Sequence, residues 1–283
     1  MTRRLQQVAV EGVKVGHWNP RRPVSSGVIG SRLALRSRPY NFGDLLGPFV
    51  VRRIVERERL RRGSGSLLSI GSVLHFARPG DTIWGTGANG KVGIGGVQHD
   101  RLSIRSVRGP RTRELLARHG TEVPEVYGDP AMLLPDVMPG LRALARDKEC
   151  KMLIVPNLHD MTLMRASVHS ARLDRSAQVL DPSSPLDEAL RRIAQSEVVV
   201  SSSLHGQIVA EALGVPVAMV QPSEESSLKY ADHLESTGRS ASVVHVSFDC
   251  SHSEALRHQV PPASWSGEGL LDAFPRDLWE GNV

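Results

Sequence analysis

The stretch that decides the fold is VVVSSSLHGQIVAEALGVPVAMV, residues 198–220. It begins with three β-branched residues, which favour a buried strand. A helical pattern follows over 204–213, Gly214 ends it, and a second apolar run covers 215–220. Strand, helix and strand in so short a stretch predict two parallel strands joined by a right-handed crossover.

The same alternation continues on both sides of this stretch. Upstream, Ser184 is expected to cap a helix over 185–195, with Pro185 at its first position. The N-terminal part predicts a helix over 44–62, capped by Asp44, and a second over 110–118. Further strands are expected at 8–15, 67–73, 81–84, 102–107, 152–155 and 178–180. A chain of 283 residues with this pattern predicts an α/β protein of two domains, 1–145 and 146–283.

The charge is distributed unevenly along the chain. Residues 1–62 carry 14 Lys and Arg against 4 Asp and Glu, whereas the rest of the chain is acidic. Arg52, Arg53, Arg57, Arg59, Arg61 and Arg62 fall along one predicted helix. They indicate either a solvated helix face or attraction to an anionic membrane surface. Nucleic acid is not expected, because no aromatic residues interleave with the arginines.

The composition also bears on location and on metals. No apolar run approaches the ~20 residues of a membrane-spanning helix, and no apolar stretch follows the N-terminal arginines. Cys150 and Cys250 lie outside any metal-binding spacing. We therefore expect a cytoplasmic protein, free or peripheral on the inner face of the plasma membrane, with no metal.

Chemistry is expected where parallel strands end, because ligands of open α/β sheets bind there. Ser201, Ser202 and Ser203 follow a strand, and His205 lies in the first turn of the next helix. Free N–H groups at a helix start, together with hydroxyls, suit a phosphate or a carboxylate. The alternative is that the serines only cap the helix and His205 is a satisfied, partly buried residue.

Two further strand ends carry candidate anion-binding groups. Thr82–Lys91 is rich in glycine, including Gly85 and Gly87, and Lys91 could add a charge, although a tight turn explains the glycines equally well. Arg108 precedes Pro110 at the start of a helix. Its planar guanidinium matches a carboxylate or a phosphate, so it is a candidate for binding an anion. The alternative is that Arg108 is an ordinary surface residue. Asn41–Asp44 and Tyr127–Pro130 are polar turns.

Taken together, these segments resemble the polysaccharide pyruvyl transferase family. The resemblance rests on residues 41–44, 70–91, 103–120, 123–135, 154–160, 201–217 and 229–239, which occur in the family's order. It is strongest toward the xanthan-type ketal pyruvyltransferases. Residues 1–39 contribute nothing to it.

The resemblance implies two Rossmann-like domains facing a cleft, in a GT-B-like fold. It implies phosphoenolpyruvate as donor, bound by the C-terminal domain, and no cofactor. The implied acceptor is a hexose of a surface glycan, usually lipid-linked, bound by the N-terminal domain. Many family members have an arginine where this chain has Ser203, so the donor-binding arginine must lie elsewhere or be dispensable, and Arg108 is the first choice for it.

The predicted roles follow from the chemistry of ketal formation, which needs an acid, anion clamps and a base. His205 is the predicted general acid, Arg108 and Lys91 hold the donor, and Asp44 or Asp129 accepts a proton from the sugar. The remaining predicted substrate-binding residues are Asn41, Gly43, Gly85, Gly87, Asn89, Asn157, His159, Ser202, Ser203, Lys229 and Tyr230.

Two other functions fit parts of the pattern. A nucleotide-sugar glycosyltransferase can use the same architecture, and Glu224-Glu225 would then be candidates for binding a nucleoside. A non-catalytic membrane-docking assembly protein would need only the basic N-terminal part.

Overall fold

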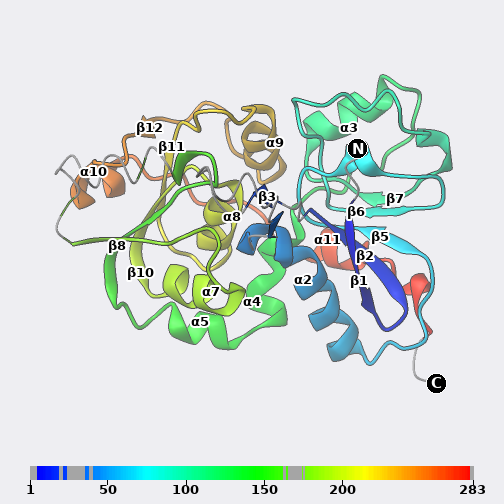
Figure 1. The fold of residues 1–283 in the computed structure, drawn as a ribbon, viewed down its shortest axis with the longest axis horizontal. Helices are drawn as coiled ribbons and strands as arrows, with labels where there is room; N and C mark the ends of the chain where they lie inside the picture. Colours follow the sequence, from blue (N-terminus) through cyan, green and yellow to red (C-terminus); the bar gives the residue numbers. More distant parts are fainter. Residues whose placement is uncertain are drawn as a thin grey trace.

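The computed structural model describes residues 5–18, 22–23, 36–37, 41–161, 164, 174 and 176–280. They form two five-stranded sheets that lie beside each other with helices around and between them (Figure 1). This is the predicted α/β class. The first sheet uses strands that precede residue 107, and the second uses strands that follow residue 149.

The first sheet has the order β1-β2-β5-β6-β7. Its strands are parallel except for β1, which pairs antiparallel with β2. The strands are β1 (Gln6–Val10), β2 (Val13–His17), β5 (Ser66–Leu68), β6 (Thr82–Trp84) and β7 (Ser103–Ser106). A separate antiparallel pair is formed by β3 (Arg22–Pro23) and β4 (Arg36–Ser37).

The second sheet has the order β12-β11-β10-β8-β9 and is parallel throughout. Its strands are β8 (Cys150–Val155), β9 (Ala177–Val179), β10 (Ser196–Ser201), β11 (Val217–Val220) and β12 (His245–Val246). Val199 of β10 pairs with Leu153 on one side and Val217 on the other. The predicted crossover over 198–220 is therefore confirmed, with α8 (Leu204–Ala212) between β10 and β11.

The remaining helices connect and cover the two sheets. In chain order they are α2 (Phe42–Glu58), η1 (Leu74–Phe76), η2 (His99–Arg101), α3 (Pro110–Ala117), η3 (Pro130–Leu133), α4 (Leu134–Val137), α5 (Gly140–Leu144), α7 (Leu186–Ala194), α9 (Leu228–Ser236), α10 (His252–Arg257), α11 (Glu268–Asp272) and η4 (Arg276–Leu278).

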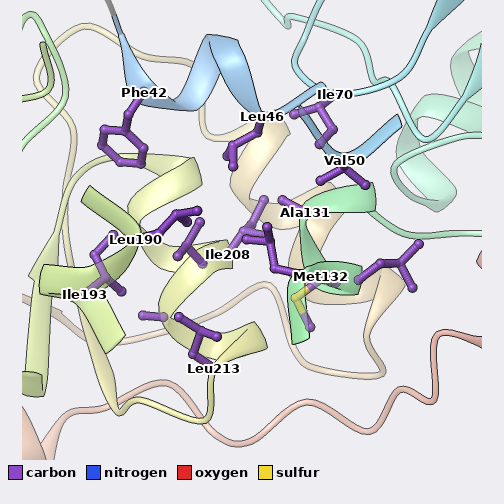
Figure 2. Packing of buried hydrophobic residues seen from close by; sticks show 14 of the residues in the cluster. Phe42, Leu46, Val50, Ile70, Ala131, Met132, Leu190, Ile193, Ile208 and Leu213 are labelled. Carbon is purple, nitrogen blue, oxygen red and sulfur yellow. The ribbon is translucent and has the colours of Figure 1, made fainter. Parts of the chain in front are cut away.

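One hydrophobic cluster joins the two halves of the molecule. Figure 2 shows Phe42, Leu46 and Val50 of α2 facing Ile193 of α7 and Ile208 of α8. All five side chains are fully buried. Burying such a side chain stabilises the folded state by roughly 1.5–3 kcal/mol. The packing of α2 against α7 and α8 therefore holds the two halves together.

The C-terminal segment returns to the first sheet (Figure 1). The indole Nε1 of Trp279 donates to the carbonyl of Val10 at 3.0 Å, and that of Trp84 donates to the carbonyl of Leu270 at 2.8 Å. Residues assigned by sequence to the second domain thus complete the core of the first. The division at 145/146 and the GT-B-like arrangement stay predictions.

Several local predictions are wrong. The single strand predicted over 8–15 is instead two antiparallel strands, β1 and β2, separated by a turn at Glu11 and Gly12. Asn41, not Asp44, caps α2, because its Oδ1 accepts from the N–H of Gly43 at 3.3 Å. Pro185 occupies the N-cap position of α7, where Ser184 was expected. The strand predicted over 67–73 ends at Leu68, since Gly71 turns the chain with φ +101°.

The basic helix is shorter than predicted. It ends at Glu58, and Arg59 adopts a left-handed φ of 57°, so Arg61 and Arg62 lie beyond it. Several of the six arginines lie within 4 Å of a carboxylate, in the pairs Arg53–Glu56, Arg57–Glu58, Arg61–Glu11 and Arg62–Glu280. These exposed pairs favour the interpretation of a solvated face. Within the described residues, no helix is long and apolar enough to cross a membrane.

Candidate active site

The turn between β10 and α8 is built from its three serines. The hydroxyl of Ser201 donates to the carbonyl of Val155 at 2.8 Å, and that of Ser202 accepts from the N–H of Asn157 at 3.1 Å. Ser203 is the N-cap of α8, and its side chain accepts from the N–H of Gly206 at 3.3 Å. All three hydroxyls therefore shape the turn that presents His205, and the binding of substrate by Ser202 and Ser203 stays a prediction.

Gly206 explains why this turn can be so tight. A Cβ at this position would lie 2.6 Å from the hydroxyl of Ser201 and 2.7 Å from Cγ1 of Val155. The first turn of α8 thus packs directly on the ends of β10 and β8. This close packing fixes the position of the neighbouring His205.

His205 faces a buried carboxyl group. Its Nε2 lies 4.0 Å from Oδ2 of Asp129, which is completely buried. Both atoms are buried, and neither has a hydrogen-bond partner within the described parts of the chain. The other carboxyl oxygen of Asp129 accepts from the N–H of Ala131 at 3.0 Å and caps η3. Buried polar atoms normally have a hydrogen-bond partner, so two facing atoms without one make this position a candidate catalytic site.

The surroundings shift the two pKa values in opposite senses. Burial, with the charges of Lys229, Arg108 and His233, lowers the pKa of His205 to about 3. Burial raises the pKa of Asp129, against the opposing effects of the Ala131 N–H, His233 and Arg108. At neutral pH the imidazole is therefore neutral, and the carboxyl group keeps its proton to a higher pH than an ordinary aspartate.

The start of α2 packs against the imidazole. A Cβ on Gly43 would lie 2.3 Å from Nδ1 of His205, so only glycine fits against the ring. Next to it, the Nδ2 of Asn41 donates to Oδ2 of Asp44 at 3.0 Å. The structure thus brings Gly43, and with it the start of α2 that carries Asn41 and Asp44, to His205.

Arg108 is buried in the interior and already has protein partners. Its Nε donates to Oδ2 of Asp232 at 3.1 Å, and its other nitrogens donate to Oγ of Ser72 at 2.7 Å and to the carbonyl of Ala88 at 2.9 Å. The alternative of a surface arginine is wrong, since the side chain is 0% exposed. Its role as a donor clamp stays a prediction.

The glycine-rich loop wraps around this guanidinium. A Cβ on Gly87 would lie 2.3 Å from Cζ of Arg108, and one on Gly85 would lie 2.3 Å from Cδ of Pro130. Asn89 accepts from the N–H of Lys91 at 3.2 Å and shapes the turn. Close packing thus accounts for both glycines, and their contact with substrate stays a prediction.

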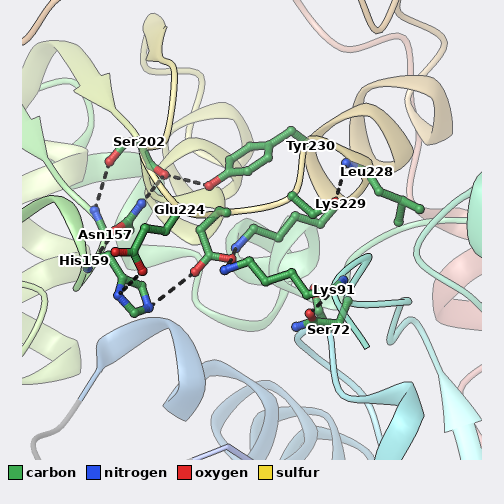
Figure 3. Close-up of polar contacts among 12 residues, drawn as sticks. Ser72, Lys91, Asn157, His159, Ser202, Glu224, Leu228, Lys229 and Tyr230 are labelled. Carbon is green, nitrogen blue, oxygen red and sulfur yellow. Dashed lines mark hydrogen bonds and ion pairs between the residues drawn. The ribbon is translucent and has the colours of Figure 1, made fainter. Parts of the chain in front are cut away.

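Lys91 and Lys229 lie around one carboxylate at the meeting of the two halves (Figure 3). Nζ of Lys229 lies 3.0 Å from Glu225, and Nζ of Lys91 lies 3.6 Å from the same Oε2. His159 lies between the glutamates, 3.2 Å from Glu224 and 3.8 Å from Glu225. Burial lowers the pKa of Lys229, with Glu225 opposing.

Asn157 and Tyr230 support the serine turn. The amide Nδ2 of Asn157 donates to Asp160 at 2.7 Å, and the hydroxyl of Tyr230 donates to the carbonyl of Ser202 at 2.7 Å. Burial raises the pKa of this Tyr230 hydroxyl. Both side chains thus position the turn that carries His205, and their contact with a substrate stays a prediction.

Sequence reasoning missed Asp232, the partner of Arg108. The signal was indirect: a buried arginine requires a carboxylate, and Asp232 lies in the segment 229–239 that carries the resemblance. A cavity of about 340 Å³ lies away from the predicted site residues and is lined by Met132, Glu211 and Trp265 among others. Among the residues that the structure describes, no His, Cys, Asp and Glu cluster could hold a metal ion.

Comparison with known proteins places this geometry in context. Residues 99–224 match the family model "Polysaccharide pyruvyl transferase". The chain is also similar to the "Succinoglycan biosynthesis protein ExoV" of Rhizobium meliloti (strain 1021), 33% identical over 137 residues. That match covers 48% of this chain and 40% of the relative, so it spans less than half of either. No solved structure gives a significant match.

Proposed function

We propose that this chain is a phosphoenolpyruvate-dependent ketal pyruvyltransferase, because residues 99–224 match the polysaccharide pyruvyl transferase family model. It moves the enolpyruvyl group of phosphoenolpyruvate onto a hexose of a surface polysaccharide or its lipid-linked precursor and releases phosphate. The relative named for succinoglycan biosynthesis supports a glycan acceptor. The observation that carries the proposal is the buried pair His205–Asp129, with cationic side chains nearby.

The pair has the arrangement of a proton relay. Nε2 of His205 faces Asp129, and Nδ1 lies on the side of Gly43. Asp129 passes its proton to Nε2, while Nδ1–H passes one to the methylene carbon of the donor. The imidazole changes tautomer in this step and needs no lasting positive charge, which agrees with its lowered pKa.

The remaining steps follow from that protonation. Positive charge develops at the carbon that carries the phosphate, and a sugar hydroxyl oxygen bonds to it while Asp44 accepts the hydroxyl proton. Phosphate leaves with the electron pair of its carbon–oxygen bond. A second hydroxyl then bonds to the same carbon and closes the ketal, and its proton leaves with the phosphate.

The donor's two anionic groups need cationic partners. Lys229 and Lys91 hold them, and the charge of Arg108 behind Lys229 adds to the positive potential, since it acts on both Lys229 and His205. The first half of the chain binds the acceptor. Glu225 is paired with lysines, which counts against its use as a nucleoside-binding residue.

A binding experiment separates this function from that of a nucleotide-sugar glycosyltransferase. Phosphoenolpyruvate should raise the melting temperature, because a ligand at 100 times its dissociation constant stabilises the folded state by about 2.7 kcal/mol. A panel of sugar nucleotides at equal concentration should leave it unchanged. Thermal shift at constant ionic strength measures both. Stabilisation by a sugar nucleotide, with no response to phosphoenolpyruvate, would contradict the proposal.

Gly43→Ala should lower the transfer rate by about 10²-fold, because the new methyl group displaces the imidazole from its place beside Asp129. Release of phosphate from phosphoenolpyruvate in the presence of acceptor measures the rate. The matched control is Gly140→Ala, where nothing lies within 4 Å of the added Cβ. Equal rates for the two variants would show that the close contact of Gly43 with His205 has no role in catalysis.

A further inference from the structure

Glu225 lies close to both Lys91 and Lys229, and Figure 3 labels these two lysines. One of its carboxylate oxygens, Oε2, lies 3.0 Å from Nζ of Lys229 and 3.6 Å from Nζ of Lys91. The other, Oε1, lies 3.8 Å from Nε2 of His159. The two lysines come from different halves of the molecule, and with His159 they surround a carboxylate as they would surround an anionic ligand.

The backbone holds this arrangement in place. Gly90 adopts φ +80°, and a Cβ there would lie 2.3 Å from Oγ of Ser226 and 3.1 Å from Cβ of Leu228. The loop of the first half therefore packs closely on the chain leading into α9. This packing of the loop places Lys91 near Glu225. The proximity of the two side chains is therefore a consequence of the fold.

The carboxylate is largely removed from solvent. The side chain of Glu225 is 16% exposed and that of Lys229 is 15% exposed. Burial alone would raise the pKa of Glu225, yet Lys229, Lys91 and His159 together lower it, so the group stays charged at neutral pH. The two lysines are thus partly neutralised before any ligand arrives.

We propose that Glu225 is an internal competitor of the anionic donor, occupying the anion site of Lys91 and Lys229 until a ligand displaces it. The inference rests on the proposed function in taking these lysines as the donor's partners. Every anion must replace the contacts of this tethered carboxylate, so the affinity for each is reduced by the same factor.

This competition favours the release of the products. Phosphoenolpyruvate carries a carboxylate and a phosphate on one molecule, and its combined contacts exceed those of one carboxylate. After transfer the two groups belong to separate molecules, the ketal and inorganic phosphate. Each is then held less firmly, and the return of Glu225 to the lysines favours the release of phosphate.

The test is the binding of inorganic phosphate to the full chain, measured by isothermal titration calorimetry. Glu225→Gln should bind phosphate about tenfold more tightly than the unmodified chain, since it removes a like charge from a partly buried site. Glu225→Asp, whose carboxylate is one methylene shorter, should lie between the two. Pyruvate should gain by the same factor as phosphate.

Glu224→Gln is the matched control, because Glu224 is adjacent, contacts His159 and is 65% exposed. It should bind phosphate as the unmodified chain does. Equal affinities for the unmodified chain and Glu225→Gln would overturn the inference, as would a variant that folds but binds no phosphate. The titration needs no sugar acceptor and no turnover, so it is independent of the transfer reaction. If the proposed transfer reaction were wrong, no transfer would be seen, but Glu225→Gln would still bind phosphate more tightly.

Discussion

Replacement of His205 by alanine is expected to lower the rate of pyruvyl transfer by about 10²–10⁴-fold, the contribution of a positioned acid. The imidazole is the group that passes a proton from buried Asp129 to the donor. Alanine has no group that can carry this proton, so the path is interrupted. Asp129→Asn should cause a similar loss, because it keeps the shape of the side chain but removes the transferable proton. Steady-state phosphate release with acceptor present measures both rates.

The control for this pair of variants is His252→Ala. His252 lies on α10, where its Nε2 is 3.1 Å from Glu197, and the proposed chemistry does not involve it. Its replacement should leave the transfer rate within twofold of the unmodified rate, roughly the scatter of a neutral surface change. If His205→Ala kept near-normal turnover, the relay through His205 would be refuted.

Asp232→Asn is expected to destabilise the fold by about 3–5 kcal/mol, the usual cost of leaving a buried charge without its partner. Both side chains of the Arg108–Asp232 pair are 0% exposed. The carboxylate also accepts from the hydroxyl of Thr112 at 2.6 Å and from its N–H at 3.0 Å, so it fastens α3 to α9. Equilibrium urea unfolding measures the loss.

A second pair between the same two helices gives the control. Arg111 donates to both carboxylate oxygens of Glu235, at 2.9 and 2.7 Å, but the side chains are 40% and 29% exposed. Glu235→Gln should therefore cost about 1 kcal/mol or less. Equal costs for Asp232→Asn and Glu235→Gln would mean that burial of the first pair carries no special energetic weight.

The turn that presents His205 could be predicted because its signals are local. Three β-branched residues, a serine cap and Gly214 specify strand, helix and helix end within a few residues of each other. The crossover over 198–220 and the position of His205 in the first turn of α8 are confirmed.

The partners of these residues could not be predicted, because they come from distant parts of the chain. Nothing near Arg108 in the sequence indicates that Asp232 neutralises it, or that the guanidinium is fully buried. Asp129 was assigned a place near the substrate, but only the tertiary structure places its carboxyl group beside His205. Long-range packing also decides that Trp279 completes the core of the first sheet.

Asn41 illustrates a smaller limit of local patterns. Both Asn41 and Asp44 are good N-cap residues, and the sequence favours neither strongly. The helix begins two residues earlier than expected because Phe42 and Leu46 pack into the shared core and Gly43 packs against His205. Tertiary contacts therefore choose between two acceptable caps.

The most direct measurement is mass spectrometry of surface glycan from cells that lack this protein and from cells complemented with it. Loss of the protein should remove one pyruvate ketal from a hexose. The unmodified chain should restore it, and His205→Ala should not. Unchanged ketal content without the protein, or full restoration by His205→Ala, would contradict the account.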